Sequence, residues 1–381
     1  MKDRNYLLMD LGIGLIVIGG GGCAAIYCAK AYGEQPFYFA GRQMIWLGIG
    51  TILFFLTARI PFAKLKQIAF PTAFLSLVIL ILTAFFGVKV NNMSGWLPIP
   101  FTGIRIQPSE LFKPVYLLAL CLAVQNKRKE LFRFLSGLAV TAGFCIQLLI
   151  QPDFGTATIY AILFPVVLYC AGFRKRYTLP VLFGWIPAGI LFVLRYPYAS
   201  RRISAFLNPE ADLYGAGWHI HQFRYTMASG GLTGANETGA LWANTYLPYA
   251  HSDSVFSALV EASGFIGGCI VLLGFCVMIL LFRKAATETN SPDKRLFLFC
   301  CGVMLTLQAF LHIGVNVTMI PPTGLPLPFF SYGGSNLAGV MLLLGAACSA
   351  YQSRESELDS QTVQEDKENC NRSEVPDQNR P

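Results

Sequence analysis

Long apolar runs alternate with short polar segments along most of the chain. Each run is long enough to cross about 30 Å of hydrocarbon as a helix with little or moderate tilt. The pattern therefore predicts an all-α polytopic membrane protein with about ten transmembrane helices. A long polar stretch, residues 195–254, is predicted to be an extracytoplasmic loop between spans seven and eight. The ten runs cover residues 6–28, 43–58, 69–88, 110–125, 134–150, 156–172, 178–194, 255–282, 297–319 and 333–351.

Composition excludes other classes of protein. Hydrophobic residues make up 54% of the chain and charged residues 13%, whereas soluble domains carry about 25% charge. A soluble enzyme, a disordered protein and a secreted disulfide scaffold are thereby excluded. Of the eleven cysteines, ten lie in or beside apolar runs without metal-ligand spacing, so we interpret them as small buried apolar residues.

Basic residues predict the orientation in the membrane. One set of loops holds 16 Lys and Arg residues and the opposite set holds 8, which places both termini in the cytoplasm. The basic excess follows from this bias and does not indicate nucleic acid binding. Residues 1–351 form the predicted membrane domain. Residues 352–381 are acidic and nearly free of apolar side chains, which predicts a disordered cytoplasmic tail.

Two polar clusters interrupt the apolar runs near the predicted outer face. Glu110 and Lys113 have i,i+3 spacing at a helix start, so they can pair, with Ser109 as a candidate cap. A capped helix end with a local ion pair and a polar cavity are both consistent with this spacing. Asp153 lies in a turn between two spans, where it either caps the next helix or points towards Lys113. Charged groups inside spans are costly and are therefore candidates for function.

The long loop re-enters the membrane at Asp253. Glu261 follows eight residues later, about 12 Å along a helix, so these two carboxylates do not form a catalytic pair. Three histidines in the loop raise the possibility of a zinc site. His219 and His221 suit adjacent faces and no cysteine is near, so a solvated or hydrogen-bonding role is favoured.

A proline- and glycine-rich segment, residues 316–336, cannot form a continuous helix. Irregular backbone at membrane depth is tolerated where protein buries it or where it lines a wet cavity. The segment is therefore either a structural re-entrant turn or the wall of a cavity.

Five ordered motifs in residues 6–352 resemble the SEDS proteins (shape, elongation, division and sporulation), the family of FtsW, RodA and SpoVE. The chain departs from the usual family pattern at Gly95, Phe223 and Ala262. The motifs are Gln107-Pro108-Ser109-Glu110-x-x-Lys113, Gln151-Pro152-Asp153-x-Gly155-Thr156, Arg202 through Gly217, Leu247-Pro248-x-x-His251-Ser252-Asp253, and Pro322-Thr323-Gly324 through Ser335.

The resemblance implies a peptidoglycan glycosyltransferase that polymerises lipid II at the outer face of the bacterial cytoplasmic membrane, for cell division or elongation. It implies that Asp253 is catalytic, and that Glu110, Lys113 and Asp153 gather near it in an outward-facing cavity. It also implies a class B penicillin-binding protein as partner, along with other divisome or elongasome membrane proteins.

The chemistry of the residues is compatible with this activity. One carboxylate can act as general base on the acceptor hydroxyl, and inversion at the anomeric carbon requires no second carboxylate nucleophile. The departing lipid pyrophosphate needs cations, for which Lys113, Arg201, Arg202 and Arg224 are candidates, together with a divalent cation such as Mg²⁺ or Mn²⁺. The remaining predicted substrate-binding residues are Gln222, His251 and Ser331.

Two alternatives remain. In a flippase or transporter, the polar intramembrane groups would form a translocation path. In a non-catalytic scaffold, the chain would only recruit the transpeptidase. Clustering of the polar residues towards one face favours the enzyme over the flippase, and the presence of Asp253 argues against the scaffold.

Overall fold

The computed structural model describes residues 2–352 except 34, 91–92, 102, 214, 216 and 236–238. The predicted acidic tail, residues 352–381, therefore lies outside the described residues apart from Gln352.

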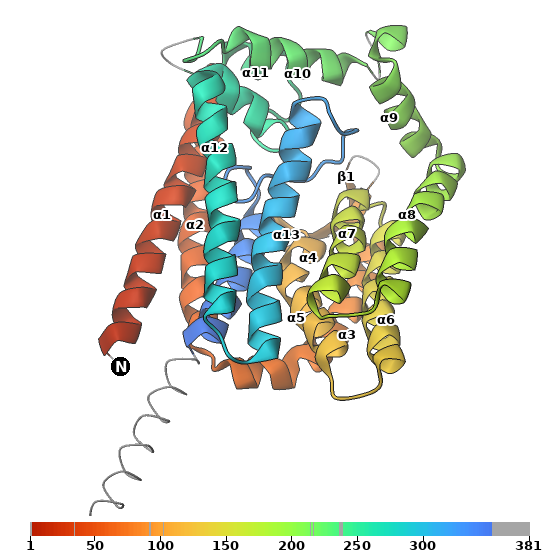
Figure 1. Ribbon diagram of the computed structural model, residues 1–381. Helices are drawn as coiled ribbons and strands as arrows, with labels where there is room; N and C mark the ends of the chain where they lie inside the picture. The colour runs from red at the N-terminus through yellow and green to blue at the C-terminus, as the bar shows by residue number, and fades with distance from the viewer. Residues whose placement is uncertain are drawn as a thin grey trace, which may run out of the picture.

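Long helices form a bundle that runs between two ends of the molecule (Figure 1). We call the end where the first helix begins and the last helix finishes the terminal end, and the opposite end the loop end. The bundle helices are α1 (Lys2–Lys30), α2 (Pro36–Arg59), α3 (Phe62–Phe86), α5 (Lys113–Gln125), α6 (Glu130–Ile150), α7 (Phe154–Cys170), α8 (Lys175–Arg195), α12 (Val255–Thr287), α13 (Pro292–Asn316) and the last helix, Gly334–Gln352.

The predicted polytopic helical fold is confirmed. Seven helices are long and apolar enough to cross a membrane, and three shorter apolar helices accompany them, Val17–Lys30, Lys113–Gln125 and Phe154–Cys170. These segments coincide with the ten apolar runs of the sequence, while the number of crossings stays a prediction. The helix Gly334–Gln352 finishes beside the end of α2, since Ser349 Oγ donates to the Ile60 carbonyl. Both ends of the described bundle thus face the same way, and the cytoplasmic assignment stays a prediction.

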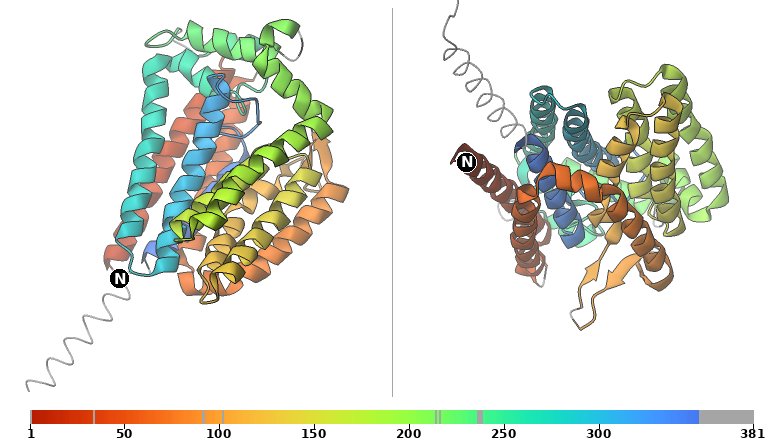
Figure 2. Two further views of the ribbon diagram at one scale, coloured as in Figure 1. Left: turned by 45° about the vertical axis from the view of Figure 1, so that its right-hand side comes forward. Right: turned by 90° about the horizontal axis from the view of Figure 1, so that it is seen from below.

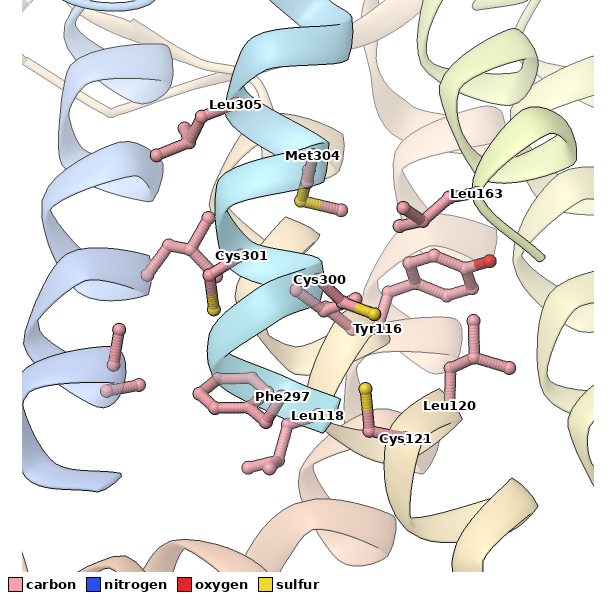
Figure 3. Close-up of a cluster of buried hydrophobic side chains, with 14 of the residues drawn as sticks. Tyr116, Leu118, Leu120, Cys121, Leu163, Phe297, Cys300, Cys301, Met304 and Leu305 are labelled. Carbon is pink, nitrogen blue, oxygen red and sulfur yellow. The ribbon is translucent and has the colours of Figure 1, made fainter. Parts of the chain in front are cut away.

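The core lies around α13 and the last helix. In each, 78% of the most apolar window is buried, against 11% in α12 and 0% in α8. Seen from below in Figure 2, both helices lie between α1 and α2 on one side and α6, α7 and α8 on the other. Figure 3 shows α13 residues Phe297, Cys300 and Met304 packed among side chains of α5 such as Tyr116 and Cys121.

The cysteines only partly follow the prediction that they are buried. Six of the ten described cysteines are buried, and Cys300 and Cys301 lie in the core as small apolar groups. Cys170, the last residue of α7, and Cys269 on α12 are exposed instead. A thiol is only weakly polar and does not depend on a place in the core.

A small antiparallel sheet, which the apolar runs do not predict, follows α3. Its strands are β1 (Val88–Val90), β2 (Met93–Pro98) and β3 (Arg105–Ile106), in the order β1-β2-β3. Val88 pairs with Trp96, and Leu97 pairs with Ile106, so branched and aromatic residues meet across the strands. The sheet leads the chain from α3 into the short helix α4 (Pro108–Leu111).

The predicted long loop is a folded region. It contains α9 (Pro197–Leu207), a 3-10 helix η1 (Pro209–Asp212), α10 (Trp218–Ser229) and α11 (Leu241–Tyr246) (Figure 1). Phe223 of α10 is buried in a cluster with alanines of α1, α11 and α12. An aromatic side chain at this departure from the family pattern thus attaches the folded loop to the bundle.

Helix α12 is broken at Gly264. Its φ of 73° is left-handed, and the N–H groups of Phe265 and Ile266 donate to the Gly231 and Leu232 carbonyls at 2.9 and 3.2 Å. The turn after α10 therefore supplies the partners that a continuous helix would have supplied. A methyl group at position 264 would lie 2.2 Å from the Leu232 oxygen, so only glycine fits here.

Candidate active site

Asp253 lies in a turn whose backbone is held by three residues from other segments. The carbonyls of residues 251, 252 and 253 accept in order from Tyr332 N at 2.8 Å, Ser331 Oγ at 2.7 Å and Asn316 Nδ2 at 3.1 Å. Asp253 lies two residues before α12, whose N-terminus lies at the loop end of the bundle (Figure 1). The turn is therefore positioned by α13 and by the irregular segment that follows it.

The Asp253 carboxyl is only partly exposed and faces a close backbone. Gly324 has a φ of 70°, and a methyl group there would lie 3.7 Å from Asp253 Oδ2. Burial raises the pKa of Asp253 to about 6, against the opposing effects of the Arg202 cation and a hydrogen bond from Ser252. Arg202 is itself held by its hydrogen bond to the Pro322 carbonyl at 2.8 Å.

Two histidines border this turn as neutral rings. His219 Nε2 lies 3.4 Å from Ser254 Oγ, and burial together with Arg202 lowers the pKa of His219 to about 4. The His251 ring packs on Phe39 at 4.1 Å between centroids, and burial lowers its pKa to about 4. Near neutral pH both imidazoles are therefore uncharged and can donate or accept hydrogen bonds.

The Glu110–Lys113 pair predicted from i,i+3 spacing is present at 2.7 Å. Both side chains are buried, at 2% and 4% exposure. Lys113 Nζ also donates to Gln308 Oε1 at 2.9 Å, so α13 supplies a second partner for the ammonium. Two of its three N–H bonds are thus directed to groups within the protein.

Asp153 caps α7, which is one of its two predicted roles. Its Oδ1 accepts from Thr156 N at 3.2 Å, and its Oδ2 accepts from Ser109 Oγ at 2.8 Å and Gln107 Nε2 at 3.3 Å. The prediction that Ser109 is a helix cap is wrong, because its hydroxyl is directed across to Asp153. The residue preceding α4 is Gln107, and no side chain caps this helix.

A ladder of three polar residues on α13 links the two clusters. Gln308, His312 and Asn316 recur every four residues and so share one face of the helix. Gln308 Nε2 donates to the Pro326 carbonyl at 2.8 Å, and His312 Nδ1 lies 2.7 Å from the Leu325 carbonyl. The ladder thus holds the segment that separates the Glu110 cluster from Asp253.

The sequence analysis did not single out this ladder. Its signal was present as polar residues with four-residue spacing inside an otherwise apolar run. Gln43 was also missed: its amide donates to the Ser331 carbonyl at 3.2 Å, and its oxygen accepts from Gly333 N at 3.2 Å. Both features position the irregular segment beside Asp253.

The other predicted substrate-binding residues fall into two groups. Arg201 on α9 and Arg224 on α10 expose their side chains at the loop end. Gln222 and Ser331 are buried and bonded within the protein: Gln222 Oε1 accepts from Trp242 Nε1 at 3.0 Å, and Ser331 Oγ bridges the Ser252 carbonyl and an amide. Their geometry is that of positioning residues, and substrate contact stays a prediction for all four.

Glu261 has a role in holding the loop region. Its two oxygens accept from Trp242 N at 2.7 Å and Ala243 N at 2.8 Å in the first turn of α11. A carboxylate at a helix N-terminus is favoured by the unpaired amides and the helix dipole. This arrangement agrees with the inference that Glu261 and Asp253 do not work as a pair.

With this geometry established, comparison with known proteins is informative. The model of the FtsW/RodA/SpoVE family, described as Cell cycle protein, matches residues 4–355. The chain belongs to this family. The resemblance carried by the five motifs is thereby confirmed, and the family members are similar over nearly the whole described chain.

Similar curated proteins include one from Trichlorobacter lovleyi named "Probable peptidoglycan glycosyltransferase FtsW", which is 31% identical over 90% of this chain and 91% of its own length. "Stage V sporulation protein E" of Bacillus subtilis is 30% identical, covering 89% and 93% of the two chains.

Solved structures agree with the family assignment. A chain from a structure described as "Structural coordination of polymerization and crosslinking by a peptidoglycan synthase complex" is similar with a TM-score of 0.76 and 27% identity, over 90% of this chain and 97% of that one. The Rod shape determining protein RodA of Thermus thermophilus is similar with a TM-score of 0.66 and 25% identity, over 90% and 96%. The present chain thus shares the multi-pass helical fold of RodA.

Proposed function

We propose that this chain is a peptidoglycan glycosyltransferase that polymerises lipid II at the outer face of the bacterial cytoplasmic membrane, with both termini in the cytoplasm and Asp253 as general base. The names of the relatives support the activity. The observation that carries the role of Asp253 is a partly exposed carboxyl on a turn whose three carbonyls are held by neighbouring segments. The solved synthase complex supports a class B penicillin-binding protein as partner.

The proposed reaction is a single displacement with inversion. Asp253 takes the proton of the acceptor hydroxyl as its oxygen bonds to the anomeric carbon, and the lipid pyrophosphate leaves with the electron pair of the broken C–O bond. The raised pKa of about 6 makes this carboxylate a stronger base than an ordinary Asp, while it remains ionised at neutral pH.

The charge of the pyrophosphate needs cations, and the loop end supplies them. Arg202 lies beside Asp253, while Arg201 and Arg224 present exposed guanidinium groups. Within the described ranges, no three His, Cys, Asp or Glu side chains gather as metal ligands. A Mg²⁺ or Mn²⁺ ion would therefore rely on Asp253 together with substrate phosphates, which is a common way of holding Mg²⁺.

The distribution of polar residues favours polymerisation over transport. The polar ladder of α13 stops at Gln308, and the turns below it towards the terminal end bury Leu305, Met304 and Cys301 in the apolar core (Figure 3). A translocation path would require polar lining through this region. The buried Glu110 cluster is instead bonded to α13 through Lys113 and Gln308.

The test is polymerisation of labelled lipid II by the purified protein with its cognate transpeptidase. Wild type and the matched control Glu210→Gln, an exposed carboxylate of η1, are expected to make polymer. Asp253→Ala, eluting as a folded protein, is expected to make none. Equal polymer from Asp253→Ala and wild type would remove Asp253 from the mechanism, and no polymer from wild type with its partner would argue against the activity.

A further inference from the structure

A cavity of about 390 Å³ lies at the terminal end, opposite the candidate active site. The ends of four bundle helices enclose it: Gln125 of α5, Cys170 of α7, Arg283 of α12 and the first turns of α13. Its volume falls within the range of about 300–1,000 Å³ that is typical of ligand sites. Nothing in the proposed polymerisation uses this cavity.

The cavity is positively charged. Arg283 and Arg295 both line it with exposed guanidinium groups, and none of the described lining residues is acidic. Arg295 is oriented by two hydrogen bonds, from Nε and Nη2 to the Thr289 carbonyl at 3.2 and 3.1 Å, which leaves Nη1 free of that contact. The first turn of α13 at Pro292 also lines the cavity, but Asp293 already faces this helix end, since its Oδ1 accepts from Lys294 N at 3.1 Å. The two arginines are therefore the groups that favour an anion here.

The rest of the lining is apolar and adjoins the outer surface of the bundle. Leu296 and Phe299 of α13 form part of the wall. Beyond the rim, Tyr169 on α7 is 75% exposed and Leu281 on α12 is 60% exposed, as expected for side chains that face lipid. A molecule in the cavity can thus extend apolar chains along the membrane-facing surface.

We infer that this cavity binds the headgroup of an anionic phospholipid, with its phosphodiester between Arg283 and Arg295. Phosphatidylglycerol has a net negative charge, whereas the trimethylammonium group of phosphatidylcholine neutralises its phosphate. Basic pockets between the helix ends of membrane proteins commonly hold anionic headgroups. The same phosphate chemistry would also admit free inorganic phosphate, which the test distinguishes.

The test counts lipids bound to the full-length protein. Delipidated protein is incubated with equal concentrations of phosphatidylglycerol and phosphatidylcholine and examined by native mass spectrometry. Wild type is expected to retain phosphatidylglycerol preferentially. The double variant Arg283→Gln with Arg295→Gln is expected to bind it at least about tenfold more weakly, the effect of losing charge-assisted hydrogen bonds. The control is Lys127→Gln, an exposed cation at the same end outside the cavity lining.

The other outcomes overturn the inference. Equal retention by wild type and the double variant would show that these arginines hold no headgroup. Displacement of the lipid by millimolar inorganic phosphate would make free phosphate the ligand. If the double variant does not fold, Arg283→Gln alone serves, because the Arg283 side chain makes no hydrogen bond or ion pair within the described chain. Retention unchanged in that variant would equally contradict the inference.

Discussion

Asn316 makes the geometry around Asp253 testable through a residue that itself has no reaction chemistry. Its Oδ1 accepts from Ser257 N at 3.0 Å and from Ser257 Oγ at 2.8 Å, which caps α12 from another helix. Its Nδ2 donates to the carbonyls of Asp253 and His312 at 3.1 and 3.0 Å. One fully buried amide thus joins the start of α12, the turn that contains Asp253, and α13.

Asn316→Ala leaves the Ser257 N–H and the Asp253 carbonyl without these partners. Each buried group left unsatisfied costs about 1–3 kcal/mol, so the two together cost about 2–6 kcal/mol. We expect a melting temperature lower by roughly 10 °C in detergent. A displacement of Asp253 by about 1 Å is expected to lower kcat by about 100-fold. Asn316→Asp retains an acceptor for Ser257 but loses both amide donors, so it separates capping from the hold on Asp253.

The assay combines melting with the pH dependence of lipid II polymerisation. If Asn316 positions Asp253, the looser and better hydrated carboxyl of Asn316→Ala should titrate below the wild-type value of about 6. A merely structural role would lower the melting temperature and leave this midpoint unchanged. Full activity with an unchanged pH profile in both variants would refute the reasoning.

Three further predictions concern other parts of the molecule. Because burial raises the pKa of Asp253 to about 6 and the ionised form is the proposed base, the wild-type rate should fall as pH drops through about 6. Initial rates measured across pH test this, and a midpoint near 4 would contradict it. Lys113→Met leaves buried Glu110 without its cation and should destabilise the protein by about 3–5 kcal/mol, measured by thermal melting, while adding Glu110→Gln should recover much of that loss. A double variant no more stable than Lys113→Met would count against the pair. Gly264→Ala places a methyl group at φ 73° and 2.2 Å from a carbonyl oxygen. It should lower the free energy of unfolding by at least about 1–3 kcal/mol, measured in the same way. The control Gly274→Ala, in open space on the same helix, should change this free energy little. Equal melting temperatures for these two glycine variants would show that the break in α12 is not needed.

Features set by neighbouring residues were predictable from the sequence. The apolar runs match the bundle helices, because about 20 apolar residues define a membrane helix without reference to the rest of the fold. The Glu110–Lys113 pair follows from helical spacing, and the Asp153 cap follows from its place before a helix. Each depends on contacts within a few residues along the chain.

Features set by distant segments were not predictable. Ser109 was expected to cap its own helix, but its partner Asp153 lies 44 residues away. Ser331 holds the Ser252 carbonyl across 79 residues, and Asn316 holds the Asp253 carbonyl across 63. Hydropathy and spacing carry no information about which segments meet.

The helices within the long loop were not predicted from the sequence. They are short, 11, 12 and 6 residues in α9, α10 and α11, and such helices are marginal without tertiary packing. Their stability comes from contacts such as Phe223 in its alanine-lined cluster and Glu261 at the start of α11. These contacts join the loop to α1 and α12 and could not be read from its polar composition.

Asp253 is proposed to act as the general base and not as a substrate-binding group. Asp253→Asn separates the two roles, because it keeps the shape of the side chain and removes its basicity; lipid II affinity and single-turnover polymerisation are measured in this variant and in wild type. We expect a Kd close to that of wild type with a polymerisation rate lower by about 100-fold or more. A loss of affinity that accounts for the whole loss of rate would contradict it, because Asp253 would then hold the substrate without taking its proton.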